Sequence, residues 1–341
     1  MYINSLDQLV FSPSDLVLAM RSPFASWMER LAIESPAMIA GIEKDHDPMM
    51  ALLAAKGNTH ESNFLKSLQD THGNKAIAMV KGQSHHDRAT ETFGYMQAGY
   101  PFIYQAYLSR DGFAGSADFL VKVEGKSNLG DYHYEAWDTK LSQTTRPYFL
   151  IQLCCYSWML ESIQGVISIE AAIVLGDLTE DRFRIARYYS FFDRLKRDFL
   201  NAQDAFTADF ACMPDPAYCS EHGAWASFAT DWIERTDGLA QIAGIRKSHI
   251  RKLRAAGVDT MTDFAVNDIK PVKGFPNATL IKLKAQAEIQ HASRGLDKPL
   301  FKILQNDNGK GLSALPPASA LDVFFDIEGH PLYDGGLEYL S

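Results

Sequence analysis

The sequence predicts an α/β fold with a mixed central sheet, and three observations lead to this prediction. Segments with the two-residue alternation of strands lie between segments with helical spacing of apolar residues. Their order along the chain is helices, a strand meander, a helix, further strands and a helix, which suits helices packed on a mixed sheet. The composition is 46% hydrophobic and 22% charged, as in an ordinary globular protein.

Length, charge and hydropathy narrow the class of protein. A chain of 341 residues is long enough for about two domains. No apolar run approaches the ~18 residues that span a bilayer, and the N-terminus lacks the basic start of a signal peptide. We therefore expect a cytoplasmic protein without membrane contact. The net charge of −9 argues against coating nucleic acid by bulk electrostatics, but it leaves local contacts with DNA open.

Helices open the chain. Ser12, Pro13 and Asp15 occupy the N-cap, first-turn and capping-box positions of a helix that we expect to continue to about residue 33. A second helix is expected over residues 49–69 and a third over residues 86–97. The second contains His60 and Glu61, and from the sequence alone His60 is a partly buried helix histidine bonded to a neighbour.

A strand meander follows these helices. The first strand, over residues 102–108, contains Gln105, which we expect to be satisfied by its neighbours. The next two strands carry Asp118 and Asp138 and are joined by a turn rich in Gly, Ser and Asn. If this hairpin folds symmetrically about Asn128, Asp118 and Asp138 lie directly opposite each other, with Cβ atoms about 4.5–5.5 Å apart.

Opposed carboxylates repel each other unless a cation lies between them or one of them is protonated. Magnesium meets this need because it is a hard ion that takes one or two carboxylates, keeps several waters and binds phosphate. Lys140 lies two residues beyond Asp138 on the same strand face, so its side chain points to the same place. A lysine there can orient a nucleophile and neutralise charge in a transition state.

A buried helix is expected after the hairpin, with Thr144 or Thr145 as its cap, Pro147 in its first turn and Gly165 as its stop. Gln152 and Tyr156 lie four residues apart on this apolar helix and therefore share one face. Buried polar groups need partners, and the strand ends are the expected ones. Strands over residues 166–175 and 182–188 and a helix over residues 191–206 complete the domain.

The ordered set of Asp118, then Asp138-Thr139-Lys140 on a strand, then Gln152 and Tyr156 on a helix resembles the RecB-like branch of the PD-(D/E)XK nuclease superfamily. The resemblance implies a restriction-endonuclease-like core over residues 1–210 and cleavage of DNA phosphodiester bonds with Mg²⁺ or Mn²⁺. It assigns catalysis to Asp118, Asp138, Lys140, Gln152 and Tyr156. It assigns the metal to His60, Asp118, Asp138 and the Thr139 carbonyl, and it favours His60 over Glu61.

Related nucleases carry an iron–sulfur cluster, with one cysteine directly before a proline of the entry helix. Ser22 stands at that position here. Within residues 211–236, Cys212, Cys219 and His222 supply at most three of the four ligands that such a cluster or a structural zinc requires. We therefore expect residues 211–236 to be a degenerate segment that is held by packing and contains no metal.

Residues 239–266, within a helical region expected over residues 237–308, resemble a helix-hairpin-helix unit. Gly257 ends its first helix and Thr260 caps its second. The basic residues of the first helix are candidates for binding DNA phosphate, and a solvated helix face between domains is equally compatible with them. The candidate DNA contacts are Arg246, Lys247, Arg251 and Lys252.

Residues 309–341 are expected to form a linker and the start of a truncated RNase H-like domain. A strand over residues 321–329 would place Asp326 and Glu328 on one face. The whole chain resembles the N-terminal part of a RecB-like nuclease that elsewhere continues into an RNase H-like domain and sometimes into a superfamily 1 helicase. The resemblance therefore implies DNA as a partner, together with a helicase domain or subunit.

The expected function is that of an exonuclease that acts on single strands or ends in DNA repair or recombination. One alternative is a non-catalytic DNA-binding scaffold that uses the helix-hairpin-helix region. Another is an RNase H-like exonuclease for which the first domain is a platform. Only fifteen residues follow Asp326, which is too few for the rest of that second site.

Overall fold

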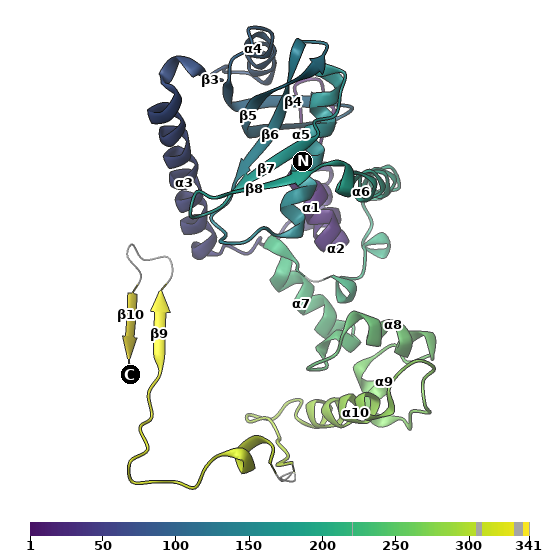
Figure 1. Cartoon of the computed structure of the whole chain (residues 1–341). Coiled ribbons are helices and arrows are strands. Elements are labelled where there is room, and N and C mark those ends of the chain that lie inside the picture. The colour runs from purple at the N-terminus through teal and green to yellow at the C-terminus, as the bar shows by residue number, and fades with distance from the viewer. Residues whose placement is uncertain (220, 305–308, 331–336, 341) are drawn as a thin grey trace. The chain divides into compact units, whose positions relative to one another are not determined.

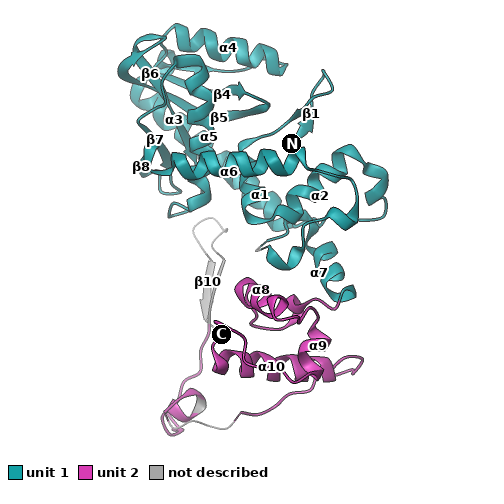
Figure 2. Cartoon of the chain, turned by 90° about the vertical axis from the view of Figure 1, so that its right-hand side faces the viewer, with its two compact units in different colours: residues 1–236 teal, residues 237–341 magenta. Residues whose placement is uncertain are grey.

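The computed structural model describes residues 1–219, 221–304, 309–330 and 337–340. The chain divides into two compact units, residues 1–236 and residues 237–341 (Figure 2). Each unit is described by itself below.

A six-stranded mixed sheet forms the centre of the first unit (Figure 1). Its spatial order follows the chain order from β3 to β8. The meander β4-β5-β6 is antiparallel, whereas β3 runs parallel to β4 and β7 runs parallel to β6. The strands are β3 (Ile77–Met79), β4 (Phe102–Arg110), β5 (Phe113–Ser127), β6 (Gly130–Thr139), β7 (Glu170–Val174) and β8 (Glu180–Arg184). This confirms the predicted α/β class with a mixed sheet.

Helices cover both faces of this sheet. On one face Phe64 of α3 (Pro48–His72) packs edge-on against Phe119 of β5, with ring centroids 5.1 Å apart. On the other face the buried helix α5 (Pro147–Gln164) packs its apolar side chains against β4, β5 and β6. Because α5 connects β6 to the parallel strand β7, it is the crossover helix that such a pair requires. Helices α4 (His85–Gln97) and α6 (Ala186–Asp204) complete the sheet domain.

The ends of α5 were predicted in part. Pro147 is its first residue, and Gly165 ends it with a left-handed φ of 72°. The predicted threonine cap is wrong, because Arg146 occupies the N-cap position without a side-chain hydrogen bond. The Thr145 hydroxyl instead donates to Asp181 Oδ2 at 2.6 Å.

The single entry helix expected up to residue 33 is two helices, α1 (Pro13–Arg21) and α2 (Pro23–Glu34). The start of α1 is as predicted, because the Asp15 carboxylate accepts hydrogen bonds from the Ser12 amide and hydroxyl at 2.7 and 2.8 Å. Pro23 explains the break, since proline lacks an amide hydrogen and clashes with the preceding turn. Ser22 caps α2 by accepting a hydrogen bond from the Ala25 amide at 3.0 Å.

Replacing Ser22 by alanine is expected to lower the free energy of unfolding by about 1–2 kcal/mol, because the buried Ala25 amide loses the Ser22 hydroxyl that accepts its hydrogen bond. Urea denaturation followed by circular dichroism measures the loss. Ser190→Ala serves as the control, because Ser190 is exposed within α6 and caps no helix. Equal stability of the two variants would contradict the capping role.

The remaining elements of the first unit lie around the sheet domain. The strand expected over residues 182–188 ends at Arg184, and α6 begins at Ala186, earlier than predicted. Strand β3 was not predicted, since three residues carry too little alternation to be recognised. The short elements are β1 (Tyr2–Ile3), β2 (Leu9–Val10), η1 (Pro36–Ile39), η2 (Asn74–Ala76), η3 (Phe210–Cys212), η4 (Pro216–Tyr218), η5 (Gly223–Trp225) and α7 (Ala226–Arg235).

The described part of the second unit contains helices and one antiparallel strand pair. Helices α8 (Lys247–Ala255) and α9 (Met261–Val266) lie where the sequence predicted them, with Gly257 at a φ of 81° between them. Thr260 caps α9 through a bond from the Asp263 amide. The other elements are η6 (Leu239–Gln241), α10 (Asn277–Ala292), η7 (Gly311–Ala314), β9 (Ile327–His330) and β10 (Leu337–Leu340).

The strand predicted over residues 321–329 is wrong for its first six residues. Residues 322–326 adopt no regular element, and the strand β9 begins only at Ile327. Phe324 is 91% exposed, so the apolar alternation that suggested a buried strand has no core to pack against among the described residues. Asp326 therefore precedes the strand and does not lie within it as expected. Across the described ranges, no helix combines the length and the apolar composition needed to cross a membrane.

Candidate active site

The two opposed carboxylates lie on β5 and β6, near the carboxyl end of β6. The hairpin pairs Phe119 with Trp137 and Glu124 with Tyr132, which is the register centred on Asn128 that the sequence predicted. The same register places Asp118 opposite Asp138, one residue beyond the last paired position. Thr139 donates its amide and its hydroxyl to Asp118 Oδ2, both at 2.8 Å. Thr139 thus holds Asp118 in place through its amide and its hydroxyl, to which the sequence pattern assigns no role.

Asp138 and Lys140 form an ion pair at this strand end. Lys140 Nζ lies 2.5 Å from Asp138 Oδ2, and the Lys140 amide donates to the Val174 carbonyl of β7 at 2.8 Å. Burial raises the pKa of Asp138 to about 7; Lys140 counteracts this, and the Asp118 carboxylate adds to it. Burial lowers the pKa of Lys140, but Asp138, Asp118 and Glu61 together leave it above its usual value. Lys140 therefore stays protonated.

Glu61 is the third carboxylate at this place, although the sequence favours His60 over Glu61 as a metal ligand. Burial raises the pKa of Glu61, and the nearby Asp118 charge raises it further. Its Oε1 accepts a hydrogen bond from Gln105 Nε2 at 2.5 Å, and Tyr104 also bonds to it. Glu61 reaches the carboxylates because α3 packs with this turn facing β4 and β5. No local sequence pattern indicates this packing.

Gln105 has an unusual backbone conformation. Its φ is 54°, a left-handed value that a residue other than glycine adopts at a cost of about 1–2 kcal/mol. The β4–β5 ladder pairs Tyr104 with Phe119 and Ala106 with Ala117, and Gln105 interrupts it opposite Asp118. Strained residues of this kind concentrate at functional sites. The Gln105 side chain is satisfied by a neighbour, as predicted, because its amide donates to Glu61; the left-handed backbone beside the carboxylates was not predicted.

His60 lies on α3 beside Glu61 but faces a different group. It is 7% exposed, and its Nε2 lies 3.4 Å from the Val174 carbonyl. Within the described residues, no three His, Cys, Asp or Glu side chains gather closely enough to hold a metal ion. The predicted set of His60, Asp118 and Asp138 is therefore not assembled as a ligand group here.

The chemistry of the donor set nevertheless fits a hard divalent cation. The Asp118 carboxylate raises the pKa values of both Glu61 and Asp138, and Lys140 supplies one positive charge against the three carboxylates. Asp138 Oδ2 contacts Lys140 but is buried without a donor in good hydrogen-bond orientation. Oxygen ligands with unneutralised charge are what Mg²⁺ and Mn²⁺ prefer.

Of the two residues of α5 that were predicted to belong to the active site, one contacts a strand that carries a site carboxylate. Tyr156 is 8% exposed and donates its hydroxyl to the Ser116 carbonyl of β5 at 2.7 Å. Burial raises its pKa, and Asp138 and Asp118 raise it further, so the phenol stays neutral. Gln152 lies one turn earlier and contacts Ser14 of α1 through Nε2 at 3.4 Å. Tyr156 thus supports the strand that carries Asp118, whereas Gln152 joins α5 to α1.

The segment over residues 211–236 is held by packing. Ser22 is fully buried as a helix cap, and Cys219 packs beside the cluster formed by Phe24, Trp225 and their neighbours. Cys212 is exposed, and the His222 ring contacts Phe24 edge-on, with centroids 5.5 Å apart.

The four candidate DNA contacts lie on or beside α8 in the second unit. Ile250 and Leu253 are on the buried side of the helix, and Arg251 and Lys252 lie on the opposite side. Arg246 and Arg251 are exposed, and Lys247 is partly exposed. Lys252 donates to the Gly274 carbonyl, so a phosphate would have to compete for it.

A scan against protein-family models finds no match to this chain, and a search of curated proteins finds no similar sequence.

Proposed function

We propose that this protein is a metal-dependent nuclease that hydrolyses DNA phosphodiester bonds. The observation that carries the proposal is the pair of opposed carboxylates, Asp118 and Asp138, with Lys140 in contact with Asp138 and Glu61 beside them. The resemblance to RecB-like PD-(D/E)XK nucleases adds to this. The sheet class and the helix that follows the hairpin are compatible with such a core.

Asp118 and Asp138 would hold Mg²⁺ or Mn²⁺, with Glu61 or His60 as a further side-chain ligand and the Thr139 carbonyl as a backbone one. The metal supplies an activated water and neutralises charge on the scissile phosphate. The chain's own groups position the reactants. Lys140 presents a protonated amine at the edge where the phosphate would lie, and Thr139 and Tyr156 fix the strands that carry the carboxylates.

The substrate we propose is DNA with a free end or a single-stranded segment, processed in repair or recombination. Arg246, Lys247 and Arg251 of the second unit add local positive charge to a chain of net charge −9. A helicase domain or subunit would supply single strands to such an enzyme. These proposals rest on the resemblance, and the geometry of Asp118, Asp138 and Lys140 is compatible with them.

Incubating the full chain with end-labelled single-stranded, double-stranded and circular DNA tests the function. We expect degradation that requires Mg²⁺ or Mn²⁺, stops with EDTA and spares circular DNA. If the protein binds DNA but cleaves none of the three with either metal, the alternative of a non-catalytic scaffold is favoured. The basic face of α8 is the feature that supports this alternative.

Two variants at neighbouring positions of α3 test which of the two residues is a metal ligand. We expect Glu61→Gln to weaken Mn²⁺ binding at least about ten-fold, because Glu61 lies beside Asp118 and removal of a carboxylate ligand costs more than 1.4 kcal/mol. His60→Gln should weaken it less, because His60 Nε2 faces the Val174 carbonyl. Isothermal titration with MnCl₂ measures both. A larger loss for His60→Gln would reverse the assignment and restore the ligand that the sequence predicted.

A further inference from the structure

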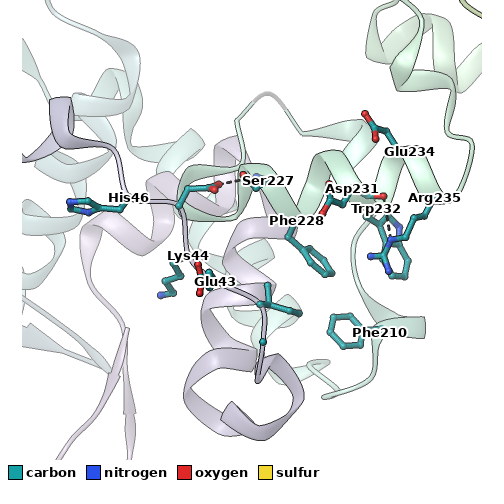
Figure 3. A pocket seen from close by; sticks show the side chains of 13 residues that line it. Glu43, Lys44, His46, Phe210, Ser227, Phe228, Asp231, Trp232, Glu234 and Arg235 are labelled. Atoms are coloured by element: carbon teal, nitrogen blue, oxygen red, sulfur yellow. Dashed lines mark hydrogen bonds between the residues drawn. The ribbon is translucent and has the colours of Figure 1, made fainter. Parts of the chain in front are cut away.

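A large cavity lies in the first unit, formed by elements other than those of the candidate active site. It has a volume of about 1020 Å³, which is at the upper end of the range for ligand pockets. One wall is the loop of residues 41–46 between η1 and α3, and the other is the exposed side of α7 with Phe210 of η3 (Figure 3).

Three aromatic rings form the apolar wall of this cavity. Phe210, Phe228 and Trp232 contact one another pairwise, with ring centroids 6.0 to 6.3 Å apart. Each ring is half-buried. Phe24 stacks on Phe228 and Trp27 packs on Phe210 from the core, so the rings are fixed before any ligand arrives. We call Phe210, Phe228 and Trp232 the aromatic wall.

The polar groups around the aromatic wall are mainly acidic. Glu43, Asp231 and Glu234 are exposed, and their carboxylates have no hydrogen bond or ion pair with any residue in the described part of the chain. Asp45 adds a fourth carboxylate, which accepts a hydrogen bond from the Ser227 amide at 2.8 Å at the start of α7. These side chains come from both walls (Figure 3).

The two strong cations at the cavity are already engaged. Lys44 Nζ lies 2.8 Å from Glu29 Oε2 and over the Trp225 ring, so its charge is neutralised within the fold. The Arg235 guanidinium lies over the Trp232 ring, 5.8 Å from its centroid, and donates through Nε to the Asp231 carbonyl at 3.3 Å. The cavity is therefore net acidic. Arg235 shows that a guanidinium can lie over Trp232.

We propose that this cavity binds a basic segment of a partner protein through an arginine side chain that lies against the aromatic wall and pairs with Asp231, Glu234 or Glu43. Ring faces attract cations, and a guanidinium forms two parallel hydrogen bonds to a carboxylate. Charge complementarity selects this occupant, because phosphate groups would be repelled by the same carboxylates. A peptide suits the cavity better than a single small cation, since about 1020 Å³ accommodates several side chains. The inference is independent of the proposed nuclease activity.

The test is fluorescence anisotropy with the full chain and a labelled peptide of four arginines separated by glycines. The comparison peptide carries citrulline in place of arginine, which keeps the shape and removes the charge. We expect the arginine peptide to bind at least about ten-fold more tightly than the citrulline peptide. Equal binding of the two peptides would refute a site that selects cations.

Charge variants localise the site. The double variant Asp231→Asn/Glu234→Gln should weaken binding of the arginine peptide about ten-fold, whereas Arg235→Gln should leave it unchanged or strengthen it by removing a competing cation. The matched control is Glu124→Gln/Asp131→Asn, which removes the same charge from the exposed tip of the β5–β6 hairpin.

All these positions are exposed, so the variants are expected to fold. Equal effects of the test and control pairs would show that only net charge matters and would overturn the proposal. Competition by spermidine at the same molar concentration as the peptide would also overturn it, because the cavity would then be a site for small polyamines.

Discussion

Replacing Lys140 by alanine is expected to lower the rate of metal-dependent DNA cleavage by roughly 10²–10³-fold, the loss typical of removing a charge-stabilising donor from an active site. The ammonium group lies 2.5 Å from Asp138 and is held above its usual pKa by three carboxylates, so it is protonated throughout the neutral range. No other Lys or Arg contacts Asp138 among the ion pairs of the described residues. Quenched time courses on end-labelled DNA measure the rate.

The same variant separates catalysis from metal binding. Removing a positive charge beside Asp138 should leave the Mn²⁺ affinity unchanged or raise it, because Lys140 and the metal compete for the same carboxylate. Lys122→Ala is the control: Lys122 lies exposed on the same hairpin and donates to the Gly99 carbonyl, away from the carboxylates. Full cleavage by Lys140→Ala, or a joint loss of cleavage in both variants, would remove Lys140 from the mechanism.

The register of the hairpin could be predicted because it follows from local sequence. Strand alternation and a turn centred on Asn128 determine which residues face each other. A shift of the strand pairing by one residue would move every side chain of the shifted strand to the other face of the sheet. Asp118 and Asp138 are therefore opposed as expected. The start of α5 at Pro147 and its end at Gly165 could also be predicted from local sequence, because each depends on the φ angle that one residue prefers.

The parts that could not be predicted depend on contacts distant in sequence. Glu61 joins the carboxylates because α3 packs across the sheet, and Gln105 turns toward Glu61 through a left-handed backbone that no sequence pattern marks. His60 occupies the adjacent position on the same helix, and one residue of rotation, about 100°, decides which side chain faces Asp118. The strand expected over residues 321–329 failed for the same reason, since apolar alternation forms a strand only where a partner strand and a core exist.

Asp138→Asn is expected to stabilise the metal-free protein at alkaline pH while it abolishes cleavage. The pKa of Asp138 is raised to about 7 by burial, against an unfolded value of 3.8. Between these values the folded chain binds a proton that the unfolded chain releases, so stability falls as the pH rises through this window. Well above pH 7 the wild type carries the full cost of a buried carboxylate, on the order of 4 kcal/mol, which the neutral amide avoids.

The difference in unfolding free energy between Asp138→Asn and wild type should therefore be small at pH 4 and reach its maximum near pH 8, as measured by urea denaturation in EDTA. Asp131→Asn, an exposed change on the same strand, should show no such pH dependence. Adding Mg²⁺ at pH 8 should stabilise the wild type but not Asp138→Asn, because the ion binds the native carboxylate and offsets its burial. If Asp138→Asn were instead less stable than wild type at pH 8, the ion pair with Lys140 would outweigh burial, and Asp138 would be a structural residue of the strand end.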